Sequence, residues 1–192
     1  MDAKNLNQEN ISNNKSHSFL EILKFTVIAL AIIIPFRAYI AEPFIVRGES
    51  MDPTFSTGHY LIVDQVTYYF HDPKREDVIV FKHPVSQNDR YLIKRIIGLP
   101  GETLHIDDGK ITIINEENPD GIIIDDSHVI VKNRTKDTIK KTLGQNEYFV
   151  MGDNRVNSSD SREWGVLESK YIVGRPILRL YPISKIGILP GV

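Results

Sequence analysis

Hydrophobic and polar positions divide the 192-residue chain into a polar tail, a short apolar stretch and a long segment of broken alternation. Residues 1–18 are polar and rich in Asn, and they hold too little apolar surface to offset the entropy lost on ordering, so we expect a disordered tail. From Phe25 to Ala41 the chain is apolar apart from Thr26 and Arg37. These 17 residues reach the lower limit for crossing a bilayer if Arg37 extends its charge to the interface, which predicts a transmembrane anchor over residues 19–41.

Three interpretations of this apolar segment compete. A cleaved secretory signal needs small residues at −3 and −1, but a cut after Ala41 places Tyr39 at −3 and a cut after Ala38 places Phe36 there. A buried core helix is the plainer alternative, yet residues 26–34 are apolar all round and lack the polar face of a surface helix. An uncleaved N-terminal anchor fits the pattern best. Three Lys before the segment against two Arg after it slightly favour an N-terminus inside the cell.

Residues 42–192 consist of short runs rich in Val, Ile and Tyr, separated by Gly, Pro, Asp and Asn, without a regular 3.6-residue period. This pattern predicts one mainly β domain built of antiparallel sheets. Residues 99–101 have the Pro and Gly of a type II turn, and we expect polar loops at 115–121 and 133–146. The predicted strands are 44–47, 60–69, 77–81, 90–97, 103–106, 110–114, 122–124, 128–131, 147–151 and 171–181.

Composition narrows the chemistry further. The 23 Lys and Arg against 25 Asp and Glu give a formal charge of −2, without the basic excess that binding to nucleic acid requires. The absence of Cys excludes disulfides, thiolate metal sites and a Cys nucleophile, so a nucleophile must be Ser, Thr, Lys or a carboxylate. The six His residues never fall three or four positions apart, so the sequence has no recognisable zinc motif.

Ser50 is a candidate nucleophile. It follows the flexible Gly48 and precedes the rigid Pro53, directly after a predicted strand, so we expect its hydroxyl to be accessible on a turn. A Ser that merely caps a turn is the plainer interpretation of this segment taken alone.

Lys94 and Arg95 are two adjacent cations in the apolar run 91–98. Alternation places Lys94 on the face of Leu92 and Ile96 and Arg95 on the other, so one of them must face an apolar layer, and the parity does not decide which. If the buried one is Lys94, desolvation lowers its pKa from about 10.4 toward roughly 7 to 8, and a neutral amine can act as a general base. Arg stays protonated and cannot. A solvated Lys on a sheet face is the commoner state.

The segment 152–165 is a dense polar loop that contains one Trp. It is either a plain surface excursion or a scaffold of hydrogen bonds that holds another group in place. Within it, Asp160 and Arg162 can pair with each other, and Ser158 can exchange a hydrogen bond with a neighbouring amine.

Behind a single N-terminal anchor, these segments in this order resemble the type I signal peptidases, the membrane-bound Ser/Lys endopeptidases that remove signal peptides from exported proteins. The resemblance covers most of the chain from Glu42 onward. One motif can arise by chance, whereas four in register are hard to explain as coincidence. The four are Ser50-Met51-x-Pro53-Thr54, Asp77-Val78-Ile79-Val80-Phe81, Lys94-Arg95-x-x-Gly98-x-Pro100-Gly101 and Gly152-Asp153-Asn154-Arg155-x-x-Ser158-x-Asp160-Ser161-Arg162.

The resemblance implies a catalytic dyad in which Ser50 is the nucleophile and Lys94 the general base. It further implies that Ser158 orients the Lys94 amine, that Asp160 and Arg162 form a supporting ion pair, and that no metal or other cofactor is required. An adjacent deprotonated amine can activate a hydroxyl without His or Asp, and the Ser50 main-chain amide would stabilise the developing oxyanion.

The chain departs from the family pattern at three positions. Gly48 stands where some members have a Ser hydroxyl as a second oxyanion donor, so that donor is in question. Val156 and Glu102 replace Asp residues that are frequent in the family. Neither of these two replacements touches the dyad.

The resemblance also implies the substrate and the cellular setting. The family binds an extended signal peptide beside an edge strand and accepts small residues at −1 and −3 of secreted preproteins. The partners would be these signal peptides and the lipid bilayer, at the cell membrane, with a cytoplasmic N-terminus and the catalytic domain on the exported side. The residues expected to bind substrate are Phe44, Val46, Met51, Phe55, Leu92 and Ile93, for which simple core packing is the alternative.

Two other functions remain open from the sequence. A soluble self-cleaving repressor-type Ser/Lys protease would share the chemistry, but the anchor and the lack of N-terminal DNA-binding helices argue against it. A membrane-tethered β domain that binds extended peptides without cutting them belongs to a different class. Mutation of Ser50 or Lys94 separates this domain from a peptidase, because only a peptidase would lose cleavage. The sequence does not indicate an oligomeric state.

Overall fold

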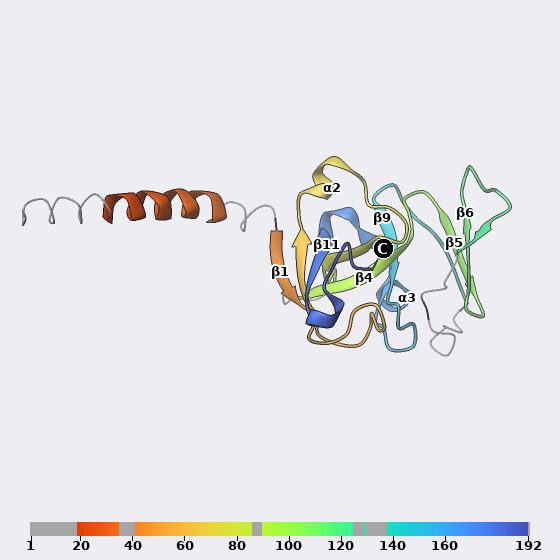
Figure 1. The fold of residues 1–192 in the computed structure, drawn as a ribbon. Helices are drawn as coiled ribbons and strands as arrows, with labels where there is room; N and C mark the ends of the chain where they lie inside the picture. The colour runs from red at the N-terminus through yellow and green to blue at the C-terminus, as the bar shows by residue number, and fades with distance from the viewer. Residues whose placement is uncertain (1–18, 35–40, 86–89, 125–128, 130–137, 192) are drawn as a thin grey trace, which may run out of the picture. The chain divides into compact units, whose positions relative to one another are not determined.

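The computed structural model describes residues 19–34, 41–85, 90–124, 129 and 138–191 of the chain (Figure 1). Its contacts divide it into two units, Met1–Ile40 and Ala41–Val192. The predicted tail over residues 1–18 lies outside the described residues, as do residues 35–40 of the predicted anchor.

Residues 19–34 of the first unit form an α-helix whose side chains are all exposed. They include the large apolar side chains of Phe19, Leu20, Ile22, Leu23, Phe25, Val27, Ile28, Leu30, Ile32, Ile33 and Ile34. Among the described residues, no helix combines the length and the apolar character needed to span a membrane.

The second unit is built from two antiparallel sheets, so the expectation of a mainly β, antiparallel domain is confirmed (Figure 1). The larger sheet has the order β1 (Ala41–Ile45), β2 (Tyr60–Asp64), β11 (Ile172–Tyr181), β3 (Val78–Lys82), β4 (Tyr91–Gly98), β9 (Glu147–Met151) and β10 (Leu167–Glu168), with β12 (Gly187–Ile188) paired to β11. The smaller sheet has the order β7 (Ile122–Ile123), β6 (Lys110–Ile114), β5 (Thr103–Asp107) and β8 (Ile139–Thr142).

Short helical turns connect these strands at α2 (Thr67–Phe70), α3 (Ser161–Trp164) and two 3₁₀ turns, Ser169–Tyr171 and Ile183–Lys185. The prediction of one strand over 60–69 is wrong in its second half. Asp64 ends β2 because its carboxylate accepts hydrogen bonds from the main-chain amides of Val66, at 2.8 Å, and Thr67, at 3.2 Å. These bonds turn the chain into α2, as capping side chains do elsewhere.

The predicted loop 133–146 is also wrong in part, because β8 lies within it and pairs with β5. Its Lys140 and Lys141 are exposed, which is common on an edge strand and hides the strand pattern in the sequence. Of the predicted strand 128–131, only Val129 is described, and it is 3% exposed.

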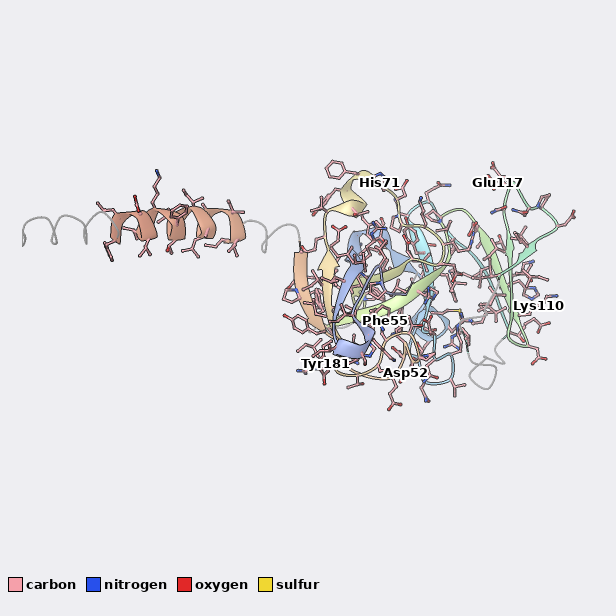
Figure 2. All side chains as sticks on the ribbon, viewed as in Figure 1. Asp52, Phe55, His71, Lys110, Glu117 and Tyr181 are labelled. Atoms are coloured by element: carbon pink, nitrogen blue, oxygen red, sulfur yellow. The ribbon has the colours of Figure 1, made fainter. Side chains whose placement is uncertain are left out.

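Three clusters of buried apolar side chains hold the domain together, and Figure 2 labels Phe55, which belongs to the third. The first joins the smaller sheet to Phe149 and Met151 of β9. The second includes Ile79, Ile96 and Val150 of the larger sheet. The third lies next to the turn that contains Ser50 and consists of Val46, Met51, Phe55, Leu61 and Val78, with Ile93 packed against it.

Candidate active site

The turn that follows β1 positions Ser50. The residues after Ser50 are fixed by two buried apolar side chains, Met51 and Phe55, which are 1% and 0% exposed. The main-chain amide of Phe55 also donates to the Met51 carbonyl at 2.8 Å. Gly48 adopts φ +93°, a conformation that side-chain-bearing residues rarely take, and it lets the chain turn sharply before Ser50. The polar loop after β9 also holds this turn, because the main-chain amide of Asn154 donates to the Ser50 carbonyl at 3.0 Å.

Lys94 lies in the middle of β4 and is 2% exposed. Its Nζ donates to Ser50 Oγ at 2.8 Å and to the Ile93 carbonyl at 3.0 Å. The two residues are 44 positions apart in the chain, and the sheet brings their functional groups into direct contact. An amine in this position can take the proton of the hydroxyl as that hydroxyl attacks a carbonyl carbon.

Burial lowers the pKa of Lys94 from 10.5 to about 8. Desolvation is the main cause, since it penalises the ammonium form. The surrounding charges act in both directions: Asp160 and Asp153 raise the pKa, while Arg90 and Arg162 lower it. Within the described part of the chain, no carboxylate lies at ion-pair distance from Lys94 Nζ. At pH 7 roughly a tenth of the amine is therefore neutral.

Arg95, the next residue, is also buried, at 4% exposure. We expected one of the two cations to be buried, whereas the structure buries both. Arg95 donates to Asp153 through Nε at 2.9 Å and Nη2 at 2.8 Å, and its Nη1 donates to the carbonyls of Glu76 and Gly191 at 2.9 and 2.7 Å. These partners compensate the charge, so Arg95 can be buried as a cation. The sequence carried no sign of this arrangement because its partners are distant in the chain.

The loop 152–165 is a scaffold of hydrogen bonds, which was one of the two interpretations of its sequence. Asp160 is fully buried and accepts from Arg162 Nε and Nη2, both at 2.8 Å, and from the Gly152 amide at 3.0 Å. Arg162 Nη2 also donates to the Arg155 carbonyl at 2.6 Å. The two side chains expected to pair are thus in contact, and they close the loop around Gly152.

Ser158 lies beside the dyad without a bond to it. Its Oγ is buried and has no hydrogen-bond partner among the described residues, so the expected contact with the Lys94 amine is absent from this structure. The space is tight: a Cβ atom added to Gly152 would lie 2.3 Å from Ser158 Oγ and 2.3 Å from the Ser50 carbonyl oxygen. Any side chain at position 152 would therefore displace Ser158 or the Ser50 turn.

A cleft of about 320 Å³ opens next to the dyad between β1 and the first half of β4. Four of the expected substrate-binding residues line it: Phe44, Val46, Leu92 and Ile93. The other two, Met51 and Phe55, are packed in the third apolar cluster and are not among the lining residues. Six further lining residues were not predicted from the sequence: Ile45, Arg47, Leu61, Val80, Arg90 and Tyr91.

The two walls of the cleft meet at the rings of Phe44 and Tyr91, which make an edge-to-face contact with 5.2 Å between centroids. Alternation from Ile93 could have pointed to Tyr91, because residues two apart share a face of a strand. β1 is an edge strand, and β4 pairs with β9 only from Arg95 onward. Among the described strands, none pairs with this second edge at Tyr91–Lys94, so main-chain groups on both walls can pair with an extended peptide.

The described residues hold no group of three or more His, Asp or Glu side chains arranged to bind a metal ion. The catalytic site offers a hydroxyl in contact with a desolvated amine, beside a cleft with free strand edges. This combination is typical of hydrolases that form an acyl intermediate on Ser.

Comparison with known proteins agrees with this class. The family model described as signal peptidase, peptidase S26, matches residues 19–181. The chain therefore belongs to the signal peptidase family S26 and is a serine endopeptidase of that family.

Its relatives include a probable signal peptidase I-1 of Synechocystis, 34% identical over 88% of this chain and 86% of the relative. A signal peptidase I of Bacillus licheniformis is 31% identical over 93% of this chain and 97% of the relative. A crystal structure of a signal peptidase I from Enterococcus faecalis aligns with 55% of this chain and 97% of that chain, at 28% identity and a TM-score of 0.45.

Proposed function

We propose that this enzyme removes N-terminal signal peptides from exported preproteins, with Ser50 as the nucleophile and Lys94 as the general base. The single observation that carries the proposal is the 2.8 Å contact between Lys94 Nζ and Ser50 Oγ, made by an amine whose pKa is lowered to about 8. The names of the relatives support the choice of substrate.

The reaction follows from this contact. Neutral Lys94 accepts the Ser50 proton while Oγ forms a bond to the carbonyl carbon of the scissile peptide. The Ser50 main-chain amide donates to the oxyanion that develops. The Lys94 ammonium then gives its proton to the leaving amine as the peptide bond breaks, which leaves an acyl group on Ser50. Water activated by the same neutral amine hydrolyses this ester and regenerates the hydroxyl.

Substrate would bind in the cleft as an extended strand between β1 and Tyr91–Lys94. Phe44, Val46, Leu92 and Ile93 would contact its side chains, with Met51 and Phe55 supporting this wall from the core. The preference for small residues at −1 and −3 is part of this proposal and rests on the relation to signal peptidases.

Ser158, Asp160 and Arg162 would act as positioning residues. The Asp160–Arg162 pair fixes the Gly152 amide, and Gly152 separates Ser158 from the Ser50 carbonyl. A rotation of the Ser158 hydroxyl group toward Lys94 during the reaction would give the amine a further acceptor and hold its lone pair toward Ser50.

Residues 19–41 would anchor the enzyme in the cell membrane as a single span, with a cytoplasmic N-terminus and the catalytic domain on the exported side. The support is the exposed apolar helix over residues 19–34 together with the apolar sequence that follows it. Anchoring would raise the effective concentration of cleavage sites that emerge at the bilayer surface.

Preprotein processing by the full chain in detergent tests the proposal. Ser50→Ala and Lys94→Ala should each lower kcat/KM by about 10⁴-fold or more while the preprotein still binds. The matched controls Ser184→Ala and Lys140→Ala, both at exposed positions, should leave cleavage unchanged. Unchanged processing in either dyad variant would refute the dyad, and a wild type that binds preprotein without cutting it would make the domain a peptide-binding module.

A further inference from the structure

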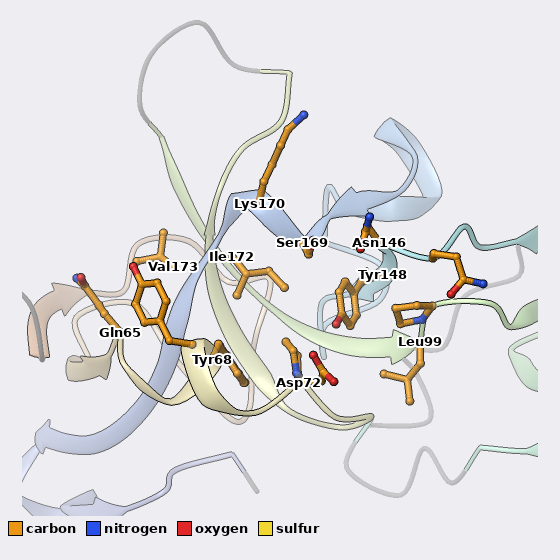
Figure 3. Close-up of a pocket in the computed structure, with 14 residues that line it drawn as sticks. Gln65, Tyr68, Asp72, Leu99, Asn146, Tyr148, Ser169, Lys170, Ile172 and Val173 are labelled. Carbon is orange, nitrogen blue, oxygen red and sulfur yellow. The ribbon is translucent and has the colours of Figure 1, made fainter.

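A second cavity of about 750 Å³ lies outside the catalytic cleft and shares no lining residue with it (Figure 3). Its walls come from four places: α2 and the residues that flank it, the turn after β4, the start of β9, and the 3₁₀ turn that leads into β11. Its volume is within the range of small-molecule binding sites. The proposed peptidase reaction makes no use of it.

Three Tyr residues contribute to this cavity: Tyr68, Tyr69 and Tyr148. Tyr148 is 4% exposed, whereas Tyr69, on the rim, is 82% exposed. The Tyr68 hydroxyl donates to Asp77 at 3.0 Å, which fixes that ring in place. The face of an aromatic ring attracts cations, so three rings in one lining supply contacts for a positive charge.

Asp72 supplies a negative charge among these rings. Figure 3 shows its carboxylate directed toward the Tyr148 side chain, and the negative charge of Asp72, after burial, is the second cause of the raised pKa of Tyr148. Among the described residues, Asp72 has neither a hydrogen bond nor an ion pair. A carboxylate that is exposed in a concave site without a partner is available to a ligand.

The one basic residue of the lining, Lys170, does not neutralise Asp72. Its Nζ pairs with Glu168 at 2.8 Å and lies 5.0 Å from the centre of the Tyr171 ring, and its side chain is 62% exposed. The hydroxyl of Ser169 and the amides of Gln145 and Asn146 add uncharged polar groups to the wall. The lining therefore combines one carboxylate that has no partner among the described residues with three aromatic rings and several neutral polar groups.

We propose that this cavity is a binding site for an alkylammonium group, with Asp72 as its counter-ion and the rings of Tyr68, Tyr69 and Tyr148 as its walls. The ammonium can come from a Lys side chain of a polypeptide or from a free aliphatic amine. Both sources have the same chemistry, and the experiment below distinguishes them.

Fluorine NMR of the full chain in detergent, labelled with 3-fluorotyrosine, measures this binding directly. The chain has eight Tyr, and Tyr148→Phe identifies the resonance of Tyr148. A Ser50→Ala background removes peptidase activity, so the result does not depend on the proposed reaction. The probes are N-acetyl-lysine methylamide, its uncharged norleucine and anionic glutamate analogues, and 1,5-diaminopentane.

The lysine derivative should shift the Tyr148 resonance in a saturable manner, and the norleucine and glutamate analogues should not. Asp72→Asn should weaken binding by about tenfold or more, since a charged partner is lost. The matched control Asp120→Asn removes an exposed carboxylate outside the cavity and should have no effect. Tyr69→Leu should weaken binding to a smaller extent, because one ring of several is lost.

The relative affinities identify the source of the ammonium. Tighter binding of the lysine derivative than of the diamine indicates a polypeptide, and the reverse indicates a free amine. The proposal is overturned if no probe shifts Tyr148, if the norleucine or glutamate analogue binds as tightly as the lysine derivative, or if Asp72→Asn binds as the parent does.

Discussion

Lys94 and Arg95 are neighbours on β4, and both are buried, but their surroundings differ. On one side of the strand, Lys94 contacts a hydroxyl and a main-chain carbonyl. On the other, Arg95 is held by two bonds to Asp153 and by two carbonyls. Burial has opposite consequences in the two regions, because the first cation can lose its proton and the second cannot. Burial alone therefore does not create a base, whereas burial without an ion-pair partner does.

The substitution Lys94→Met should have the largest effect, and it tests the difference between the surroundings of Lys94 and those of Arg95. It should abolish cleavage, by about 10⁴-fold in kcat/KM, without lowering the free energy of unfolding. Keeping the ammonium buried at neutral pH costs about 3 kcal/mol, given a shift from 10.5 to about 8, so the variant should be as stable as the wild type or more stable. Urea unfolding at pH 7 together with a processing assay measures both quantities.

Because protonation of Lys94 is linked to folding, the stability difference between Lys94→Met and the wild type should depend on pH. A Lys whose folded-state pKa is lowered carries its full penalty below pH 8, and the penalty disappears as the pH rises toward 10.5. The stability difference between Lys94→Met and wild type should therefore shrink between pH 8 and 10. A marked loss of stability in Lys94→Met at pH 7 would mean that Lys94 is a structural cation like Arg95.

On the other side of the strand, Asp153→Ala should lower the free energy of unfolding, which Lys94→Met should not. It removes the two shortest bonds from the buried Arg95 guanidinium to a carboxylate and leaves the longer contact with Glu76 at 3.9 Å, so we expect a loss of about 3 kcal/mol of unfolding free energy. Exposed ion pairs contribute little, so Glu168→Ala, which breaks the surface pair with Lys170, serves as the control and should change the urea midpoint hardly at all. Equal effects of the two substitutions would show that the Arg95 pair is not the buried support described above.

A smaller effect is expected at Gly191, whose carbonyl accepts from Arg95. A Cβ atom there would lie 2.8 Å from the Phe55 ring, and the residue adopts φ +96°. Gly101→Ala is a matched control, because Gly101 adopts φ +80° and its nearest neighbouring atom would be 3.9 Å away. The control should lose about 1–2 kcal/mol from the backbone alone, and Gly191→Ala roughly 1–3 kcal/mol more. Equal urea midpoints of Gly191→Ala and Gly101→Ala would show that a side chain at position 191 does not clash with Phe55.

The smallest effect concerns two arginines of the cleft wall. Arg90 lowers the pKa of Lys94 by charge repulsion, so Arg90→Gln should move the rising limb of the kcat/KM profile toward higher pH. Arg47 lines the same cleft but is not among the charges that shift Lys94, so Arg47→Gln should leave the limb in place. Low ionic strength is needed because salt screens exposed charges. A profile that moves equally in both variants would contradict this assignment.

Much of this arrangement could be predicted from local sequence. The strands around Ser50 and Lys94 follow from short runs of Val, Ile and Tyr, and the pairing of Asp160 with Arg162 is local in the chain. What could not be predicted depends on partners distant in sequence. Arg95 and Asp153 are 58 positions apart, so alternation alone left open which cation is buried and gave no sign that both are.

Two further features were missed for related reasons. β8 is a lysine-rich edge strand, and its pairing with β5 across a long connection leaves no local pattern. The cavity around Tyr148 is assembled from four separate segments, each of which is an ordinary turn or strand end in the sequence. By contrast, the bond between Ser158 and Lys94 that the resemblance implies is absent from the structure, since Ser158 Oγ has no hydrogen-bond partner among the described residues.

Direct titration of the Lys94 amine tests the central claim. In the full chain labelled with ¹³C at lysine Cε, the resonance that Lys94→Met removes identifies Lys94. Its chemical shift should titrate with a midpoint near pH 8, and kcat/KM should rise through the same midpoint as the neutral amine appears. A midpoint near 10.5, with activity that is flat down to acid pH, would show a permanently charged Lys94 and contradict its role as the base.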